Sequence, residues 1–223
     1  MNDMRPAKLG PDFRSDNVGA ASPEIIEALV RANHDTATGY GGDTWSQELQ
    51  QRFSDLFETK LRVYAVATGT AANALAMAAI TPSYGAAFCH ERAHILTSEV
   101  NAASFFSGGA LLVTVPGPHG KLDPGALDAA IAGAGKGMMH RSQPASVNLV
   151  QATDLGVVYS VDEVRAITAV AKRHGLRVHM DGARFANAVA RLGCKPADLT
   201  TRAGVDILSF GMTKNGGLLC DCL

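Results

Sequence analysis

The stretch SVDEVRAITAVAKRHGLRVHMDGAR, residues 160–184, predicts a helix, a turn and a strand in direct succession. Ser160 and Glu163 have the spacing of a capping box, apolar residues follow at helical intervals, and Gly175 ends the helix. The apolar run 176–180 then predicts a buried strand. A helix that leads directly into a buried strand is the repeating unit of proteins in which helices cover a parallel sheet. This stretch therefore predicts an α/β fold.

The same alternation continues on both sides of this stretch. Further strands are predicted at the apolar runs 62–67, 86–89, 111–115, 147–150, 205–210 and 218–223. Helices are predicted from Ser22-Pro23 onward with Ile25, Ile26, Leu29 and Val30 as a buried stripe, over 45–56, from the turn at 68–70 to Ile80, and over 98–106, 124–132 and 183–192. Residues 133–146 are predicted to form one long loop. We therefore expect a mostly parallel sheet with helices on both faces, made of residues 21–223 after an N-terminal arm over 1–20.

Composition and charge exclude several classes of protein. The 223 residues include 20 Lys and Arg against 21 Asp and Glu, a net charge of −1, which gives no electrostatic footprint for nucleic acid. Residues 1–13 contain no signal-peptide core, and polar residues interrupt the most apolar stretch, 65–80. We therefore expect a soluble, cytoplasmic protein with no membrane or nucleic-acid partner.

The four cysteines have no spacing typical of a disulfide framework, so reduced thiols are expected. Cys220-Asp221-Cys222 has the form of half a metal site. It lacks a second Cys/His pair at zinc spacing, and two residues on one side of a strand are the favoured explanation. No metal is predicted.

Ligands of open α/β sheets bind beyond the carboxyl ends of the strands, and four segments there carry unusual residues. Thr68–Asn73 (TGTAAN) turns a strand into a helix whose first N–H groups suit an anion, although a plain turn is the alternative. Asp181 ends a strand and could keep a cationic ring nitrogen protonated, with the guanidinium of Arg184 suited to a carboxylate. A helix cap followed by a helical arginine is the alternative for this pair.

Two further residues complete the set. Lys214 follows a strand inside a glycine-bracketed loop, where partial desolvation could prepare an amine for covalent catalysis. His94 follows a short strand and could stack on a flat ligand or transfer a proton. A solvated lysine and a surface histidine are the alternatives. Together, a phosphate cradle, a ring-nitrogen carboxylate, a stacking partner and a reactive lysine are the four requirements of pyridoxal phosphate.

The chain from Phe13 onward resembles the threonine aldolase family of fold-type-I pyridoxal-phosphate enzymes, most of all its low-specificity L-threonine aldolases. The resemblance is carried by Phe13–Asn17 (FRSDN), Tyr40–Asp43 (YGGD), Thr68–Asn73 (TGTAAN), Ala93-His94, His179–Arg184 (HMDGAR) and Ser209–Gly216 (SFGMTKNG). It implies cleavage of L-threonine or L-allo-threonine, or a similar β-hydroxy-α-amino acid, to glycine and an aldehyde. Another fold-type-I lyase, an aminotransferase or a non-catalytic fragment are the alternatives.

The resemblance also implies a role for each motif residue. Lys214 carries the cofactor, Asp181 pairs with its ring nitrogen and His94 stacks on the ring. Gly69 and Thr70 bind the phosphate of the cofactor, and Thr213 adds a further contact to it. Ser15 and Arg184 bind the substrate carboxylate, and Arg184 is also expected to contact the cofactor. His94, or a water that it positions, is the expected base.

Two departures from the family pattern stand out. Asp154 occupies a position where family members often carry histidine, which puts that histidine's contribution to the substrate hydroxyl in doubt. Family members also continue past the segment 211–217 that contains Lys214, here called the lysine loop, into a smaller C-terminal domain. We therefore expect this chain to be the large, cofactor-binding domain without that small domain. The full-length protein is expected to form a homodimer or homotetramer.

Overall fold

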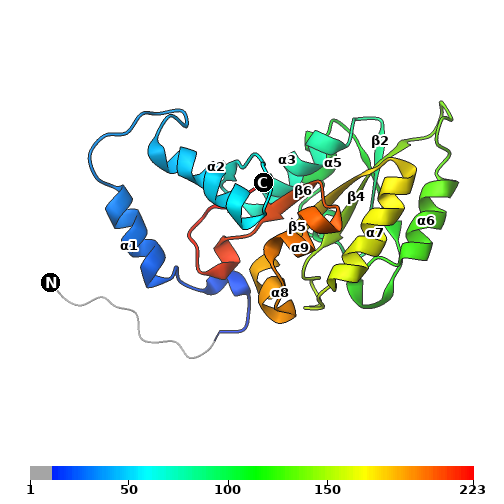
Figure 1. Ribbon diagram of the computed structural model, residues 1–223. Helices are drawn as coiled ribbons and strands as arrows, with labels where there is room; N and C mark the ends of the chain where they lie inside the picture. Colours follow the sequence, from blue (N-terminus) through cyan, green and yellow to red (C-terminus); the bar gives the residue numbers. More distant parts are fainter. Residues whose placement is uncertain (1–11) are drawn as a thin grey trace.

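The computed structural model describes residues 12–223 (Figure 1). Residues 1–11 of the expected N-terminal arm lie outside the described residues. Seven strands form one sheet in the spatial order β1 (Ala65–Val66), β7 (Asp221–Cys222), β6 (Ile207–Phe210), β5 (Arg177–Gly182), β4 (Gln143–Val150), β2 (Gly85–His90) and β3 (Leu111–Val115). All neighbouring pairs from β6 to β3 are parallel, whereas β7 runs antiparallel to both β1 and β6. The expected mostly parallel α/β fold is confirmed.

Helices cover both faces of this sheet. The described residues also form α1 (Pro23–Ala32), α2 (Thr44–Leu56), α3 (Gly69–Ile80), α4 (His94–Thr97), α5 (Ala102–Phe106), α6 (Pro124–Gly133), α7 (Val161–His174), α8 (Phe185–Leu192) and α9 (Pro196–Leu199). Along β2, Ala86 and Phe88 enter the larger core, which is shared with α6 to α9. Ala87 and Cys89 enter a second core shared with α3, α4 and α5. Side chains that alternate between two cores are the mark of a sheet buried on both sides.

The helix quoted first, α7, has the boundaries that its sequence predicts. Ser160 Oγ accepts a hydrogen bond from the Glu163 N–H, and the Glu163 carboxylate accepts one from the Ser160 N–H at 2.7 Å. Gly175 ends the helix at φ +77°, a conformation that glycine adopts without steric cost. Local signals were sufficient here because they satisfy the backbone groups at both helix ends.

The structure corrects two predictions that surround the second core. The helix expected over 98–106 begins only at Ala102, as α5, because Val100 and Asn101 have φ values of +48° and +62°, which no α-helix accommodates. The short helix α4 ends before this range, at Thr97. The loop expected over 133–146 is shorter, since β4 begins at Gln143, where it pairs with Gly85 of β2. Pairing with a distant strand decides that boundary.

The remaining corrections concern the region around β1 and α1. The strands expected over 62–67 and 218–223 are only the two-residue strands β1 and β7, which pair with each other. The expected buried stripe of α1 is wrong: Leu29 and Val30 are 53% and 69% exposed, because α1 lies apart from the sheet (Figure 1). Within residues 12–223, no helix has both the length and the apolar composition that crossing a bilayer requires.

Candidate functional site

A pocket of about 220 Å³ lies where the carboxyl ends of β5 and β6 meet the first turn of α3. It is lined by Asn17, Thr68, Gly69, Thr70, Asn73, His94, Glu99, Asp181, Ala183, Gly211, Thr213, Lys214, Leu219 and Asp221. Six of the site residues predicted from the sequence are in this set: Gly69, Thr70, His94, Asp181, Thr213 and Lys214. Larger hollows elsewhere on the described surface contain none of them. The fold therefore gathers residues from four distant segments into one place.

The first turn of α3 presents free N–H groups to this pocket. Thr68 caps the helix: its Oγ1 accepts from the Ala71 N–H at 3.1 Å, and its carbonyl accepts from the Ala72 N–H at 3.0 Å. The N–H groups of Gly69 and Thr70 precede these bonds, so both are available to a ligand. The positive end of the helix dipole adds to them, and this turn therefore has the arrangement of donors that suits an anion.

Asp181 is a buried carboxyl group at the floor of the pocket. It is the fifth residue of β5, is 1% exposed and caps no helix, since Arg184 is the N-cap of α8. One carboxyl oxygen accepts from the Ala183 N–H at 3.1 Å and the other from the Asn73 side-chain amide at 3.0 Å. Burial raises the pKa of Asp181. A cationic group placed against it would favour its charged form, because opposite charge favours ionisation.

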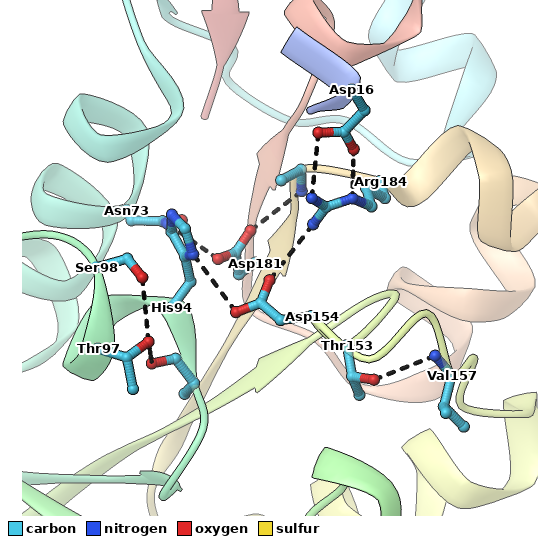
Figure 2. Close-up of polar contacts among 12 residues, drawn as sticks. Asp16, Asn73, His94, Thr97, Ser98, Thr153, Asp154, Val157, Asp181 and Arg184 are labelled. Carbon is cyan, nitrogen blue, oxygen red and sulfur yellow. Dashed lines mark hydrogen bonds and ion pairs between the residues drawn. The ribbon is translucent and has the colours of Figure 1, made fainter. Parts of the chain in front are cut away.

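Asp154, the residue that departs from the family pattern, connects His94 to Arg184 (Figure 2). His94 Nδ1 lies 3.4 Å from one Asp154 oxygen, and Arg184 Nη1 lies 3.4 Å from the other. Asp16 binds the opposite edge of the guanidinium: its carboxylate accepts hydrogen bonds from Nε at 2.6 Å and from Nη2 at 3.3 Å. Asp154 raises the pKa of His94, and His94 lowers the pKa of Asp154. The two carboxylates fix Arg184, which is not among the residues that line the pocket. Ser15, the residue before Asp16, is exposed and also lies outside the lining set, and its Oγ accepts from the Asn17 N–H at 3.1 Å.

The lysine loop is held by the side chain of Asp221 in β7. One oxygen of Asp221 accepts from the N–H groups of Met212 and Thr213 at 2.7 and 3.1 Å. The Thr213 hydroxyl donates within the loop, to Leu218 O at 3.2 Å or to Asp221 at 3.3 Å. This places Thr213 in the pocket wall with its hydroxyl already engaged. Lys214 follows in a 3₁₀ turn, half-buried and facing the pocket.

A family model described as beta-eliminating lyase matches residues 12–219. The chain belongs to this family. Two proteins named low specificity L-threonine aldolase, from Pseudomonas sp. (strain NCIMB 10558) and Pseudomonas aeruginosa, are 44% and 45% identical to it. Each alignment covers 92% of this chain and 58% of the relative, so the chain spans little more than half the length of these relatives.

Solved structures agree with this assignment to the beta-eliminating lyases. A threonine aldolase from Leishmania major is 28% identical with a TM-score of 0.85, over 93% of this chain and 60% of that one. A serine palmitoyltransferase from S. paucimobilis, solved with pyridoxal phosphate bound, is 18% identical with a TM-score of 0.62, over 90% and 48% of the two chains. The second likeness shows the fold alone. The expected fold-type-I fold and the resemblance to threonine aldolases are both confirmed.

Four pocket or rim residues of this beta-eliminating lyase escaped the sequence analysis as site residues: Asp16, Asn73, Glu99 and Asp221. Asp16 and Asn73 lie inside quoted motifs, where each is one polar residue among several. Glu99 fell inside a wrongly predicted helix, and Asp221 was considered only beside its cysteines. Asp16, Asn73 and Glu99 meet their partners 26 to 168 positions away, so local patterns carry no signal for them. Asp221 meets the lysine loop eight and nine positions away, through backbone N–H groups that no side-chain pattern marks.

Proposed function

We propose that this pocket binds pyridoxal phosphate and that the protein cleaves β-hydroxy-α-amino acids such as L-threonine or L-allo-threonine to glycine and an aldehyde. The observation that carries the proposal is the meeting of Asp181, Lys214 and the free N–H groups of α3 in one pocket. Within residues 12–223, no lysine or arginine lies within salt-bridge distance of Asp181. A pyridinium N–H fits this unpaired, buried carboxyl group.

Each residue then has a task toward the cofactor. Lys214 would carry it, Asp181 would keep its ring nitrogen protonated, and the N–H groups of Gly69 and Thr70 would hold its phosphate. His94, 34% exposed at the pocket, offers a flat face for stacking. Bound pyridoxal phosphate supplies an electron sink for the pair released from the broken Cα–Cβ bond. The protein therefore has to orient that bond and move protons.

Arg184 is held so that its guanidinium can orient a substrate carboxylate. Asp16 occupies the Nε–Nη2 edge and Asp154 takes one hydrogen of Nη1, which leaves one hydrogen each on Nη1 and Nη2. These two remaining hydrogens, with the nearby Ser15 hydroxyl, can bind an α-carboxylate. A fixed carboxylate restricts rotation about Cα and so selects which bond is broken.

His94 is the base that we assign to the β-hydroxyl group. Its Nδ1 faces Asp154, so Nδ1 carries the hydrogen and the neutral ring keeps its lone pair on Nε2. Nε2 can then take the hydroxyl proton, while Asp154 stabilises the imidazolium that forms. Other family members often carry a histidine at the position of Asp154, where it contributes to the substrate hydroxyl. In this chain Asp154 would contribute indirectly, by orienting His94 and stabilising its charged form.

The proposal extends to the whole protein. Its partner is a small amino-acid substrate, the full-length protein assembles into a homodimer or homotetramer, and it acts in the cytoplasm. Residues 1–20 form an N-terminal arm, and residues 21–223 form the cofactor-binding domain.

Borohydride trapping and product analysis test the proposal. We expect reduction of the protein with pyridoxal phosphate to leave a pyridoxyl group on Lys214 in peptide mass maps, and L-threonine to release acetaldehyde. Lys172→Arg is a matched control, since Lys172 lies on α7 outside the pocket. Label on Lys172 or Lys195 would refute the site, and a keto acid in place of acetaldehyde would identify an aminotransferase.

A further inference from the structure

Glu99 is a buried acid to which the proposed reaction gives no task. It lies in the bend between α4 and α5, is 4% exposed and lines the pocket together with Asp181 and Lys214. Taking a carboxyl group out of water is costly unless hydrogen-bond partners compensate for it. The partners of Glu99 therefore indicate what the residue does.

Asn73 connects Glu99 to Asp181. From Nδ2, the Asn73 amide donates to Glu99 Oε1 at 2.9 Å and to Asp181 Oδ2 at 3.0 Å; Figure 2 shows its contact with Asp181. Both amide hydrogens are thus used, and Asn73 Oδ1 has no hydrogen-bond partner among residues 12–223. A flipped amide would turn its oxygen toward two carboxyl groups. Glu99 and Asp181 together therefore fix the orientation of Asn73.

The two carboxyl groups differ in how well they support a negative charge. Asp181 accepts two hydrogen bonds, whereas Glu99 accepts one, and its Oε2 has no partner in the described part of the chain. The carboxyl group with more donors keeps its charge more readily. Burial raises the pKa of Glu99 to about 7, and the nearby negative charge of Asp181 adds to this effect. Glu99 is therefore the member of the pair that takes up a proton more readily.

The other groups around Glu99 do not reverse this preference. The Asn73 amide, His94 at the start of α4 and the Thr70 hydroxyl lower the pKa of Glu99, but burial is the larger influence. Lys214 and Asp221, from the lysine loop and β7, face the same pocket and carry opposite charges. A neutral Glu99 still accepts from Asn73, so the contact with Asp181 survives when Glu99 is protonated.

We propose that Glu99 is a positioning residue for Asp181: as a neutral acid it fixes the Asn73 amide, and Asn73 directs an ionised Asp181 toward the ring nitrogen of the cofactor. This inference rests on the proposed function, since it names a further residue of the same site. Glu99 acts through Asn73 and touches no reacting atom. Its influence should therefore depend on whether the ligand has a ring nitrogen.

Two substitutions separate positioning from packing. Glu99→Met fills a similar volume without an acceptor for Asn73, and Glu99→Gln imitates the neutral acid. We would measure binding of pyridoxal phosphate, and of its analogue with C–H in place of the ring nitrogen, by absorbance titration. Glu99→Met should weaken pyridoxal phosphate about tenfold, the value of one charge-assisted hydrogen bond, and leave the analogue unchanged. Glu99→Gln should restore binding to within about twofold of the unsubstituted protein.

A second measurement needs no cofactor. In carbon-13 NMR of the carboxyl groups of the cofactor-free protein, Glu99→Met should raise the titration midpoint of Asp181, because a released Asn73 donates to it less well. Glu99→Gln should leave that midpoint in place. Melting temperatures identify any variant that fails to fold, and the Gln variant then decides the question.

The outcomes distinguish this inference from the proposed function. Equal losses for both ligands, or an Asp181 midpoint that Glu99→Met does not move, would overturn the role of Glu99. An unsubstituted protein that forms no cofactor absorption band would overturn the proposed function. In that case the cofactor-directed part of this inference falls with it, while the NMR titration still decides whether Glu99 acts on Asp181.

Discussion

Gly211 is the point where the lysine loop passes closest to the segment that carries Asp181 and Arg184. A Cβ at Gly211 would lie 2.4 Å from the carbonyl oxygen of Ala183 and 2.6 Å from its Cα. Both are backbone atoms, so no side-chain rotation can relieve the clash. Real Cβ atoms essentially never come within 3.0 Å of such a neighbour, so Gly211→Ala must separate the two segments by about 0.6 Å.

The displacement has two measurable effects. We expect Gly211→Ala to lower the free energy of unfolding by about 1–3 kcal/mol, the usual cost of overpacking by one methyl group. For a chain of this size that lowers Tm by roughly 2–12 °C. Threonine cleavage should fall by about tenfold to a hundredfold, because Lys214 moves relative to Asp181 and a misplacement near 1 Å costs about a hundredfold in rate.

The assay compares Gly211→Ala with a second glycine substitution. Gly133 ends α6, nothing lies within 4 Å of its would-be Cβ, and Gly133→Ala should be neutral or slightly stabilising. Calorimetric Tm, the cofactor absorption band and the rate of acetaldehyde release would be measured for both variants and the unsubstituted protein. A Gly211→Ala protein with unchanged Tm and rate would refute the reasoning, since the two backbones would then be free to separate at no cost.

Three substitutions test individual site residues. Asp181→Asn keeps the shape but removes the charge, so steady-state kinetics should show cleavage falling at least about tenfold further than cofactor affinity; unchanged turnover would make the carboxyl group structural. Arg184→Lys loses the planar guanidinium, and KM for threonine should rise about tenfold with the cofactor band retained; loss of folding alone would contradict this. Asp154→Asn should lower the pKa of His94, because Asp154 raises that pKa in the parent protein. Proton NMR of the imidazole ring measures the change. The ion pair stabilises the folded protein while His94 is protonated, and that stabilisation is lost as pH rises through the raised pKa. The loss of stability in the variant should therefore be larger near pH 5 than in alkali, where only the contact of Asp154 with Arg184 is missing. A loss that does not change with pH would show that the charge of His94 plays no part.

The elements that could be predicted are those whose ends are fixed by nearby residues. The α7 helix carries its own capping box and its own terminal glycine, and the parallel strands are short apolar runs with breaks on either side. Their hydrogen bonds and burial follow from residues a few positions away. The apolar run 218–223 predicts a strand, but the short extent of β7 and its antiparallel pairing depend on the distant strand β1 and on β6. The break between α4 and α5 depends on two left-handed residues, Val100 and Asn101, which no apolar pattern marks.

The sequence by itself determined the α/β class, the carboxyl-end location of the site and the motifs that carry Lys214, Asp181 and His94, because these depend on residue type and short spacing. Only the tertiary structure decided which polar residues touch them: Asp154 on His94, Asp16 on Arg184, and Asn73 with Glu99 on Asp181. Hydrogen bonds and ion pairs act over about 3 Å between atoms. Residues 26 or 168 positions apart reach that distance only when the sheet and its helices pack, so their partners could not be read from the order of residues alone.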